Sequence, residues 1–253
     1  MPQDQGMVAA RTAAVAGLTF RIHSSVHPDP AAVYVLVHGI GMSHRYLRRL
    51  HAVLAQRATV HSLDMPGFGG TPKPRREVPV EEMAAALGGV VVLLGSEPVV
   101  AVGHSMGSQW VVELGATRPD LVSHVVVIGP VTDDHRRNGS VQALALGLDS
   151  CGEPPAANAI VFTDYVRCGP RWYLRQLGPM LTYPIERRVA ELSAPLLIIR
   201  GGADPVATRQ WCRRLRDAAG TGRLVEVPGR PHIVQWGAPR AVASALRAFV
   251  LAP

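Results

Sequence analysis

Length, composition and charge place this chain among ordinary globular proteins. It has 253 residues, of which 47% are hydrophobic and 18% charged, which excludes an intrinsically disordered chain. The net charge of +7 comes from scattered arginines, with Lys73 the only lysine, so we expect no nucleic-acid partner.

Cysteine usage and the N-terminal residues bear on the cellular compartment. Cys151, Cys168 and Cys212 cannot all pair within one chain, and nothing else indicates an oxidising environment. The first 25 residues contain acidic and basic side chains and no apolar run of the secretory kind. The longest apolar candidate, residues 78–95, is interrupted by glutamates and glycines. We therefore expect a reduced, cytoplasmic protein with no membrane partner.

Apolar runs and helical patterns alternate along the chain. Residues 44–57 repeat Leu47, Leu50 and Leu54 at intervals of three and four, and residues 239–250 have a similar period. Between such segments lie runs of valine, leucine and isoleucine, as in strands covered on both faces. This alternation predicts an α/β fold, a mostly parallel twisted sheet with helices on both faces. The predicted strands are residues 14–22, 32–38, 59–64, 99–103, 124–128, 195–200 and 223–227.

Residues 131–192 interrupt this alternation. They contain no convincing strand, and their helical pieces at 139–148 and 171–181 are separated by glycine and proline. A connection of this length inside a compact domain is usually functional. We predict a helical cap inserted at 131–192 into a core formed by residues 1–130 and 193–253.

The segment Gly103-His104-Ser105-Met106-Gly107 has the pattern G-x-S-x-G. It directly follows an apolar strand candidate and precedes a candidate helix. Such a strand–turn–helix arrangement presents a serine hydroxyl at the sheet edge, and small residues on either side avoid a clash. Ser105 is therefore the predicted nucleophile.

A serine hydroxyl needs a base, and the base needs a carboxylate that orients it. His232 lies in the loop after the last predicted strand, and Asp204 follows the strand at 195–200, so the order is Ser, Asp, His. The competing acids are Asp133 and Asp134, which follow the strand at 124–128.

An oxyanion requires two N–H donors near the nucleophile. One is predicted to be the backbone of Met106. The other is predicted in the glycine-rich loop after residues 32–38, where Ile40 is the first choice and Gly41 the alternative. His38, at the start of this loop, is expected to be a structural hydrogen bonder.

Together these motifs resemble the α/β-hydrolase family over essentially the whole chain. The matching segments are His38–Gly41, Asp64–Gly69, Gly103–Gly107, Gly201–Pro205 and His232, all in the family's order. The resemblance implies a serine hydrolase that uses no cofactor. It also implies that the Asp64–Gly69 turn is structural. The histidines lack metal-ligand spacing, so no metal is expected.

The substrate is less closely specified by the sequence. A small ester or lactone is the favoured substrate, handled by a monomer or homodimer. His104 and Ile233 stand where hydrolases of ring-fission products carry asparagine and tryptophan, but a carbon–carbon bond hydrolase remains an alternative, as does a receptor-like binding protein. The predicted substrate-binding residues are Gly41, Met42, His104, Trp172, Tyr173, Met180 and Ile233.

Overall fold

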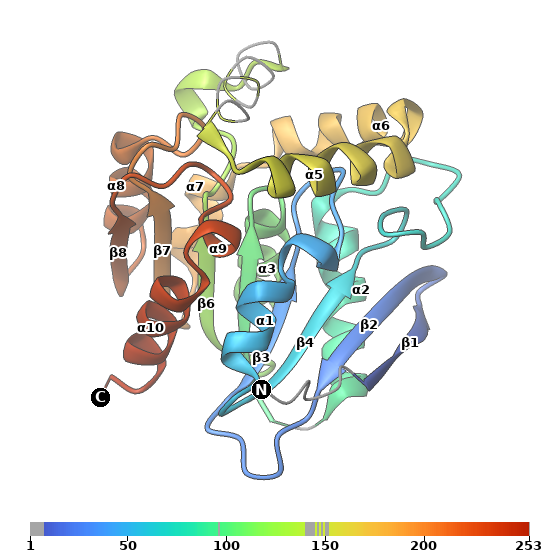
Figure 1. The fold of residues 1–253 in the computed structure, drawn as a ribbon, viewed down its shortest axis with the longest axis horizontal. Helices are drawn as coiled ribbons and strands as arrows, with labels where there is room; N and C mark the ends of the chain where they lie inside the picture. The colour runs from blue at the N-terminus through green and yellow to red at the C-terminus, as the bar shows by residue number, and fades with distance from the viewer. Residues whose placement is uncertain are drawn as a thin grey trace.

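A twisted, mostly parallel sheet runs through the molecule (Figure 1). The computed structural model describes residues 8–95, 97–139, 145, 147, 149 and 152–252. The strand order is β1-β2-β4-β3-β5-β6-β7-β8; β2 pairs antiparallel with β1 and β4, and the other neighbours are parallel. The strands are β1 (Val8–Val15), β2 (Leu18–Ser25), β3 (Val33–Val37), β4 (Thr59–Asp64), β5 (Val99–His104), β6 (Val122–Ile128), β7 (Leu196–Gly201) and β8 (Gly222–Val227).

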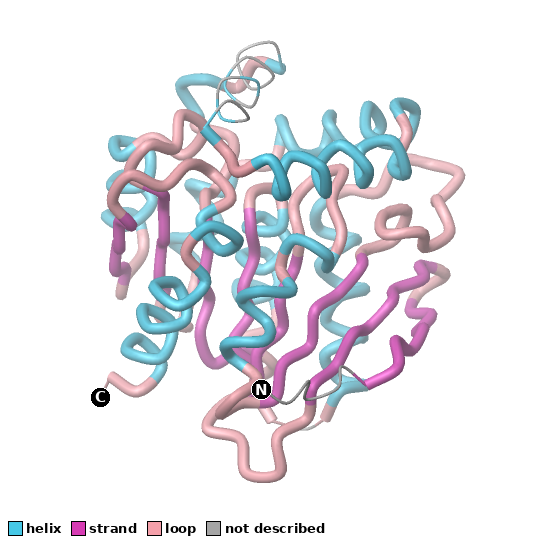
Figure 2. The backbone as a smooth tube through the Cα atoms, viewed as in Figure 1, coloured by secondary structure: helices cyan, strands magenta, loops and turns pink. Residues whose placement is uncertain are grey.

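Helices cover both faces of this sheet, as predicted (Figure 2). Successive side chains of a strand point to opposite faces. In β3, Val35 and Val37 accordingly belong to one hydrophobic core, and Tyr34 and Leu36 to the other. The first core is completed by α2 (Val80–Leu94), α3 (Gly107–Thr117) and α8 (Arg209–Ala218), and the second by α1 (Arg48–Leu54), α9 (Val234–Gly237) and α10 (Pro239–Val250).

The N-terminal strand prediction was wrong in one respect. Residues 14–22 do not form a single strand but contain the turn of the β1–β2 hairpin. Ala16 and Gly17 form this turn with φ values of 50° and 76°. Two consecutive left-handed residues match the twist of a tight hairpin. The alanine at the first position hid the turn, because left-handed backbone is uncommon for residues other than glycine, asparagine and aspartate.

Between β6 and β7 the chain leaves the sheet and forms α5 (Pro155–Cys168), α6 (Pro170–Thr182) and α7 (Ile185–Arg188), together with the short 3-10 helices η2 (Asp134–Arg136) and η3 (Val189–Glu191). α5 and α6, called the cap helices below, lie above the carboxyl ends of the strands (Figure 1). The predicted helical piece 171–181 is part of α6, whereas 139–148 lies mostly outside the described residues. The division into a core and an inserted cap stays a prediction.

Candidate active site

Ser105 occupies a strained turn between β5 and α3. Its φ is +55°, and its N–H donates to the Ile128 carbonyl at 2.9 Å. The glycines on either side are required because there is no room for a side chain at their positions. A Cβ on Gly103 would lie 2.2 Å from the Gly107 carbonyl oxygen, and one on Gly107 would lie 2.6 Å from the His38 oxygen. A non-glycine residue held at positive φ is an energetic cost found mainly at functional sites.

His232 and Asp204 are brought together by the loops after β8 and β7. The Nδ1 of His232 lies 2.8 Å from Asp204 Oδ2, while Asp204 Oδ1 accepts the N–H groups of Val206 and Ala207 at 2.8 and 3.0 Å. Burial alone would raise the pKa of the Asp204 carboxyl, but the charge and hydrogen bond of His232 outweigh burial and lower this pKa. The carboxylate is thereby kept ionised beside the imidazole.

The same pairing acts on the histidine in the opposite sense. Burial alone would lower the pKa of His232, yet the charge of Asp204 and its hydrogen bond raise it above the ordinary value. Its Nε2 is buried and has no hydrogen-bond partner in the described part of the chain. This ring nitrogen is therefore available to take a proton from another group.

The competing acids Asp133 and Asp134 lie elsewhere. Both bind the Arg214 guanidinium, which is 2.7 Å from Asp134 Oδ1, and Asp133 also accepts the His135 N–H at 3.0 Å. Asp204, and neither of these two, is the partner of the His232 ring.

The glycine-rich loop after β3 approaches the serine closely. A Cβ on Gly39 would lie 2.8 Å from Ser105 Cβ, so only glycine fits there. Among the described residues, no acceptor takes the backbone N–H of Ile40 or of Met106. These are the two donors predicted for an oxyanion. His38 holds the loop, because its Nδ1–H donates to the Gly39 oxygen at 2.7 Å while its Nε2 accepts the Met65 N–H at 3.0 Å.

A hydrogen-bond chain that the sequence did not reveal links this loop to the histidine. The Gly39 N–H donates to the Tyr46 hydroxyl at 2.8 Å, and this hydroxyl donates to Nδ1 of His104 at 2.7 Å. Nε2–H of His104 then donates to the His232 carbonyl at 3.2 Å. Burial, and next the charge of His232, hold the pKa of His104 well below its usual range. The ring is therefore neutral, as it must be to accept a hydrogen bond at Nδ1 while it donates one from Nε2. Tyr46 follows no motif, so only the fold shows its role.

Gly129 is a second residue that the sequence analysis missed. It follows β6 with φ +54°, and a Cβ there would lie 2.8 Å from His232 Cε1 and 3.3 Å from Asp204 Oδ2. The absent side chain leaves the space in which the imidazole lies.

A cavity of about 320 Å³ borders Ser105 and His232. Of the predicted substrate-binding residues, Met42, His104, Tyr173 and Ile233 line it, and Gly41 packs beneath the rings of Tyr165 and Tyr173. The described lining residues include no lysine or arginine. They are Gly39, Ile40, Met42, Tyr46, His104, Ser105, Gly147, Asp149, Glu153, Asn158, Val161, Tyr165, Tyr173, His232 and Ile233.

Two predicted substrate-binding residues lie elsewhere, which corrects their assignment. Trp172 packs on Phe68, with ring centroids 5.9 Å apart, and leaves no room for a side chain at Gly67. Met180 is buried in the first core, and its carbonyl accepts from Gln109 at 2.8 Å. Trp172 thus attaches α6 to the loop after β4 and Met180 attaches it to α3, because α6 packs apolar side chains against the core as well as toward the cavity.

Comparisons with known proteins agree with this architecture. The family described as "alpha/beta hydrolase fold" matches residues 33–147. The structure of the enol-lactonase from Burkholderia xenovorans LB400 superposes with a TM-score of 0.82 at 20% identity, covering 96% of this chain and 100% of that one. The chain has the α/β-hydrolase fold.

Sequence relatives extend this result. (E)-2-((N-methylformamido)methylene)succinate hydrolase of Acinetobacter baylyi is 25% identical over 237 residues, which cover 85% of this chain and 89% of that protein. An uncharacterized protein of Mycobacterium tuberculosis is 35% identical over 133 residues, or 52% of this chain. The alignment spans 38% of the length of that mycobacterial relative.

Two further acids approach the histidine from the segment that leads into α5. Asp149 Oδ1 accepts the backbone N–H of His232, and Glu153 Oε1 accepts that of Ile233, both at 2.7 Å. Burial raises the pKa of Glu153 to about 7, although the Ile233 N–H opposes this increase, and burial also raises the pKa of Asp149. Glu153 Oε2 is buried without a hydrogen-bond partner among the described residues.

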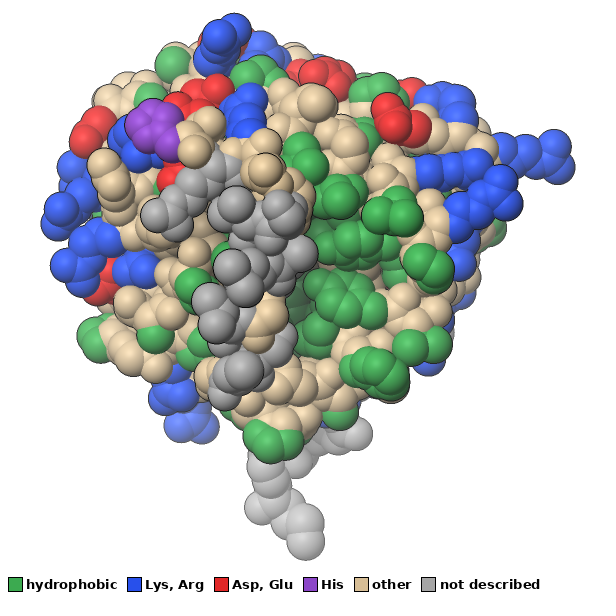
Figure 3. Space-filling model, turned by 90° about the horizontal axis from the view of Figure 1, so that it is seen from above, with side chains coloured by type: hydrophobic (Ala, Val, Ile, Leu, Met, Phe, Trp, Pro, Cys, Tyr) green, Lys and Arg blue, Asp and Glu red, His purple; other side chains and the backbone are tan. Residues whose placement is uncertain are grey.

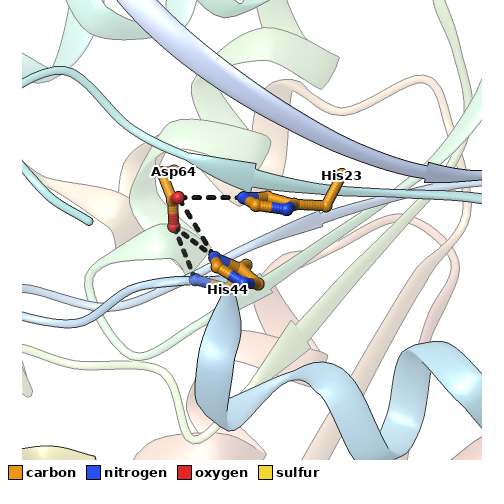
Figure 4. A group of neighbouring side chains, drawn as sticks. All are labelled: His23, His44 and Asp64. Carbon is orange, nitrogen blue, oxygen red and sulfur yellow. Dashed lines mark hydrogen bonds and ion pairs between the residues drawn. The ribbon is translucent and has the colours of Figure 1, made fainter. Parts of the chain in front are cut away.

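His23, His44 and Asp64 form a separate cluster between β2, η1 (His44–Tyr46) and β4 (Figure 4). Asp64 accepts from His23 Nε2 at 3.0 Å and from Nδ1 and the backbone N–H of His44 at 2.9 and 2.8 Å. The two rings stack with centroids 3.4 Å apart and planes inclined by 21°. Nearly parallel rings direct their in-plane nitrogens side by side, whereas a shared metal needs both to converge on one point. The cluster is a hydrogen-bonded connection within the fold.

Proposed function

We propose that this chain is a serine hydrolase that cleaves an uncharged carboxylic ester or lactone through an acyl-enzyme at Ser105. The observation that carries the proposal is the pair Asp204–His232, whose unpaired Nε2 borders the same cavity as the strained serine. This arrangement has the three roles that acyl transfer needs, namely a nucleophile, a base and a carboxylate that orients the base.

In the proposed mechanism, Ser105 Oγ attacks the carbonyl carbon and its proton passes to His232 Nε2. The N–H groups of Ile40 and Met106 stabilise the oxyanion that forms. His232 then gives the proton to the leaving oxygen, and the acyl-enzyme remains. A water molecule, deprotonated by the same ring, attacks the acyl group; the bond to Ser105 Oγ breaks, His232 returns the proton to that oxygen, and the acid is released. Asp204 stays ionised and holds the ring in the tautomer that exposes Nε2.

The charge of the cavity supports an uncharged substrate. Asp149 and Glu153 line it, no described lining residue is cationic, and most of the remaining surface is apolar or aromatic. The Acinetobacter relative is named for a succinate substrate. A dicarboxylate bound here would face two carboxyl groups without a compensating cation, which costs free energy in a low-dielectric cavity. The proposal therefore differs from that relative in substrate charge.

The test is hydrolysis of p-nitrophenyl esters of increasing acyl length by the wild type and Ser105→Ala. Loss of the nucleophile from a Ser-His-Asp site costs on the order of 10⁶ in kcat. Ser123→Ala is the matched control, because Ser123 lies at the amino end of β6 and, among the described residues, its hydroxyl contacts only the Val99 carbonyl and its neighbour His124. Turnover that survives Ser105→Ala would refute the mechanism. Labelling of Ser105 by a fluorophosphonate without turnover of any ester would retain the nucleophile and refute the ester substrate.

A further inference from the structure

The outer face of the cap helices exposes large apolar side chains. Phe162 and Val166, one helical turn apart on α5, are 69% and 67% exposed, and Leu174 on α6 is 64% exposed. Phe162 and Val166 border a shallow groove together with Tyr165, Gly169, Pro170 and Tyr173. Seen from above, hydrophobic side chains gather around a hollow on this face (Figure 3). Contiguous exposed apolar surface of this kind marks a site of interaction.

A cationic groove adjoins this apolar face. It is lined by Lys73 and Arg75, from the loop before α2, and by Arg171 and Arg175, one turn apart on α6. Its described lining contains no acidic side chain, and no ion pair neutralises any of these cations within the described residues. Gly169 and Pro170 border both grooves, so apolar and cationic surface are continuous.

We infer that this face binds peripherally to the surface of an anionic lipid membrane. Apolar side chains that enter the acyl boundary, beside cations that remain among anionic headgroups, are the two features that interfacial binding requires. A nucleic acid would use the cations but not the aliphatic side chains of Val166 and Leu174. A second copy of the chain would place like charges opposite one another.

Such binding is peripheral. Within the described ranges, no helix combines the length and apolar character needed to cross a bilayer. The sequence predicts no membrane partner, because no segment of it is apolar enough for long enough to span a bilayer. The proposed surface contains no span, and it combines residues 73–75 with residues 162–175, which are adjacent only in the folded chain.

The proposed surface is also continuous with the catalytic cavity. Tyr165 and Tyr173 line both the apolar groove and the cavity beside Ser105, and their rings meet edge to face with centroids 5.6 Å apart. An apolar ester that leaves the membrane at this groove would reach the serine by passing these two rings. This delivery step rests on the proposed function, whereas membrane binding does not.

Co-sedimentation of the full chain with vesicles tests the inference. The wild type should bind phosphatidylglycerol–phosphatidylcholine vesicles and not pure phosphatidylcholine. Each arginine near an anionic surface contributes roughly five-fold to binding, so Arg171→Gln with Arg175→Gln should weaken the partition coefficient about 25-fold. Phe162→Ser should weaken it about ten-fold or more by removing a side chain that enters the bilayer.

Matched controls lie on other faces. Arg213→Gln with Arg240→Gln also removes two arginine charges, both of them exposed, and Val92→Ser with Leu93→Ser removes exposed apolar side chains from α2. Both should bind vesicles like the wild type. Absence of binding to anionic vesicles, or equal weakening by the controls, would overturn the inference. So would binding of inorganic phosphate alone, or a dimer that Phe162→Ser converts to a monomer. Because vesicle binding needs no turnover, Ser105→Ala should bind normally, which separates this result from the failure of the proposed reaction.

Discussion

Replacing Gly129 by alanine should displace His232, the proposed base, while leaving its chemistry intact. The new methyl group would lie 2.8 Å from His232 Cε1 and 2.9 Å from Nδ1, whereas ordinary contact begins at 3.4 Å. The ring or the backbone must therefore move by about 0.6 Å, the difference between 3.4 and 2.8 Å. A misplacement of roughly 1 Å can cost on the order of 10² in rate, so we expect kcat to fall between about ten-fold and a hundred-fold. Alanine held at φ +54° should also destabilise the fold by about 1–2 kcal/mol.

Gly17 provides the control that separates these two effects. It also has a left-handed backbone, with φ +76°, but a Cβ there would meet no atom within 4 Å. Gly17→Ala should therefore lower the free energy of unfolding, measured in urea, by a similar amount and retain the kcat of the wild type. The assay is ester hydrolysis at saturating substrate, together with unfolding of each variant. If the kcat of Gly129→Ala is within two-fold of that of Gly17→Ala, a methyl group at position 129 does not displace His232 and the reasoning is refuted.

Two further predictions concern buried polar side chains. Tyr46→Phe leaves the Gly39 N–H and His104 Nδ1 buried without their partner. It should therefore lower the free energy of unfolding by about 2 kcal/mol and reduce kcat more than it raises KM. A variant with the stability and the kcat of the wild type would contradict the role given to this hydrogen-bond chain. Burial lowers the pKa of His51 to about 4, against 6.5 for the unfolded group, so its contribution to stability is complete above pH 6.5 and is lost as the pH falls toward 4. This loss amounts to about 3 kcal/mol of the free energy of unfolding. Urea unfolding measured between these pH values should show that this free energy declines less steeply with pH in His51→Gln than in the wild type. Equal declines in the two proteins would show that His51 is not the group that titrates.

The meeting of Ser105, Asp204 and His232 at one candidate site was predictable, because local sterics and strand order determine their positions. Gly103 and Gly107 must be small wherever a serine occupies this turn, so the motif itself reports the geometry. The loops that carry Asp204 and His232 follow neighbouring parallel strands, whose carboxyl ends meet at one edge of the sheet. An alternating sequence is sufficient to predict that arrangement.

The residues that were missed depend on contacts between distant segments. Tyr46 is 58 positions from His104, and Glu153 is 80 positions from Ile233, so no local pattern records either pairing. Trp172 shows the opposite error. Its aromatic side chain suggested a pocket wall, but the choice between cavity and core depends on which face of α6 meets the sheet. Periodicity defines the faces of a helix without telling which partner each face contacts.

The backbone hydrogen bonds between the cap segment and the histidine loop have a consequence for the order of events in turnover. Asp149 and Glu153 accept the N–H groups of His232 and of the residue after it, and all of these groups are buried. A cap that swung outward would remove both acceptors, and the two N–H groups would then have to bind water instead. The cap segment therefore adds two backbone contacts to those by which Asp204 and His104 already hold His232. In the proposed mechanism, opening the cavity to substrate would therefore loosen the loop that carries the base, so access to Ser105 and its activation by His232 would be coupled through this contact.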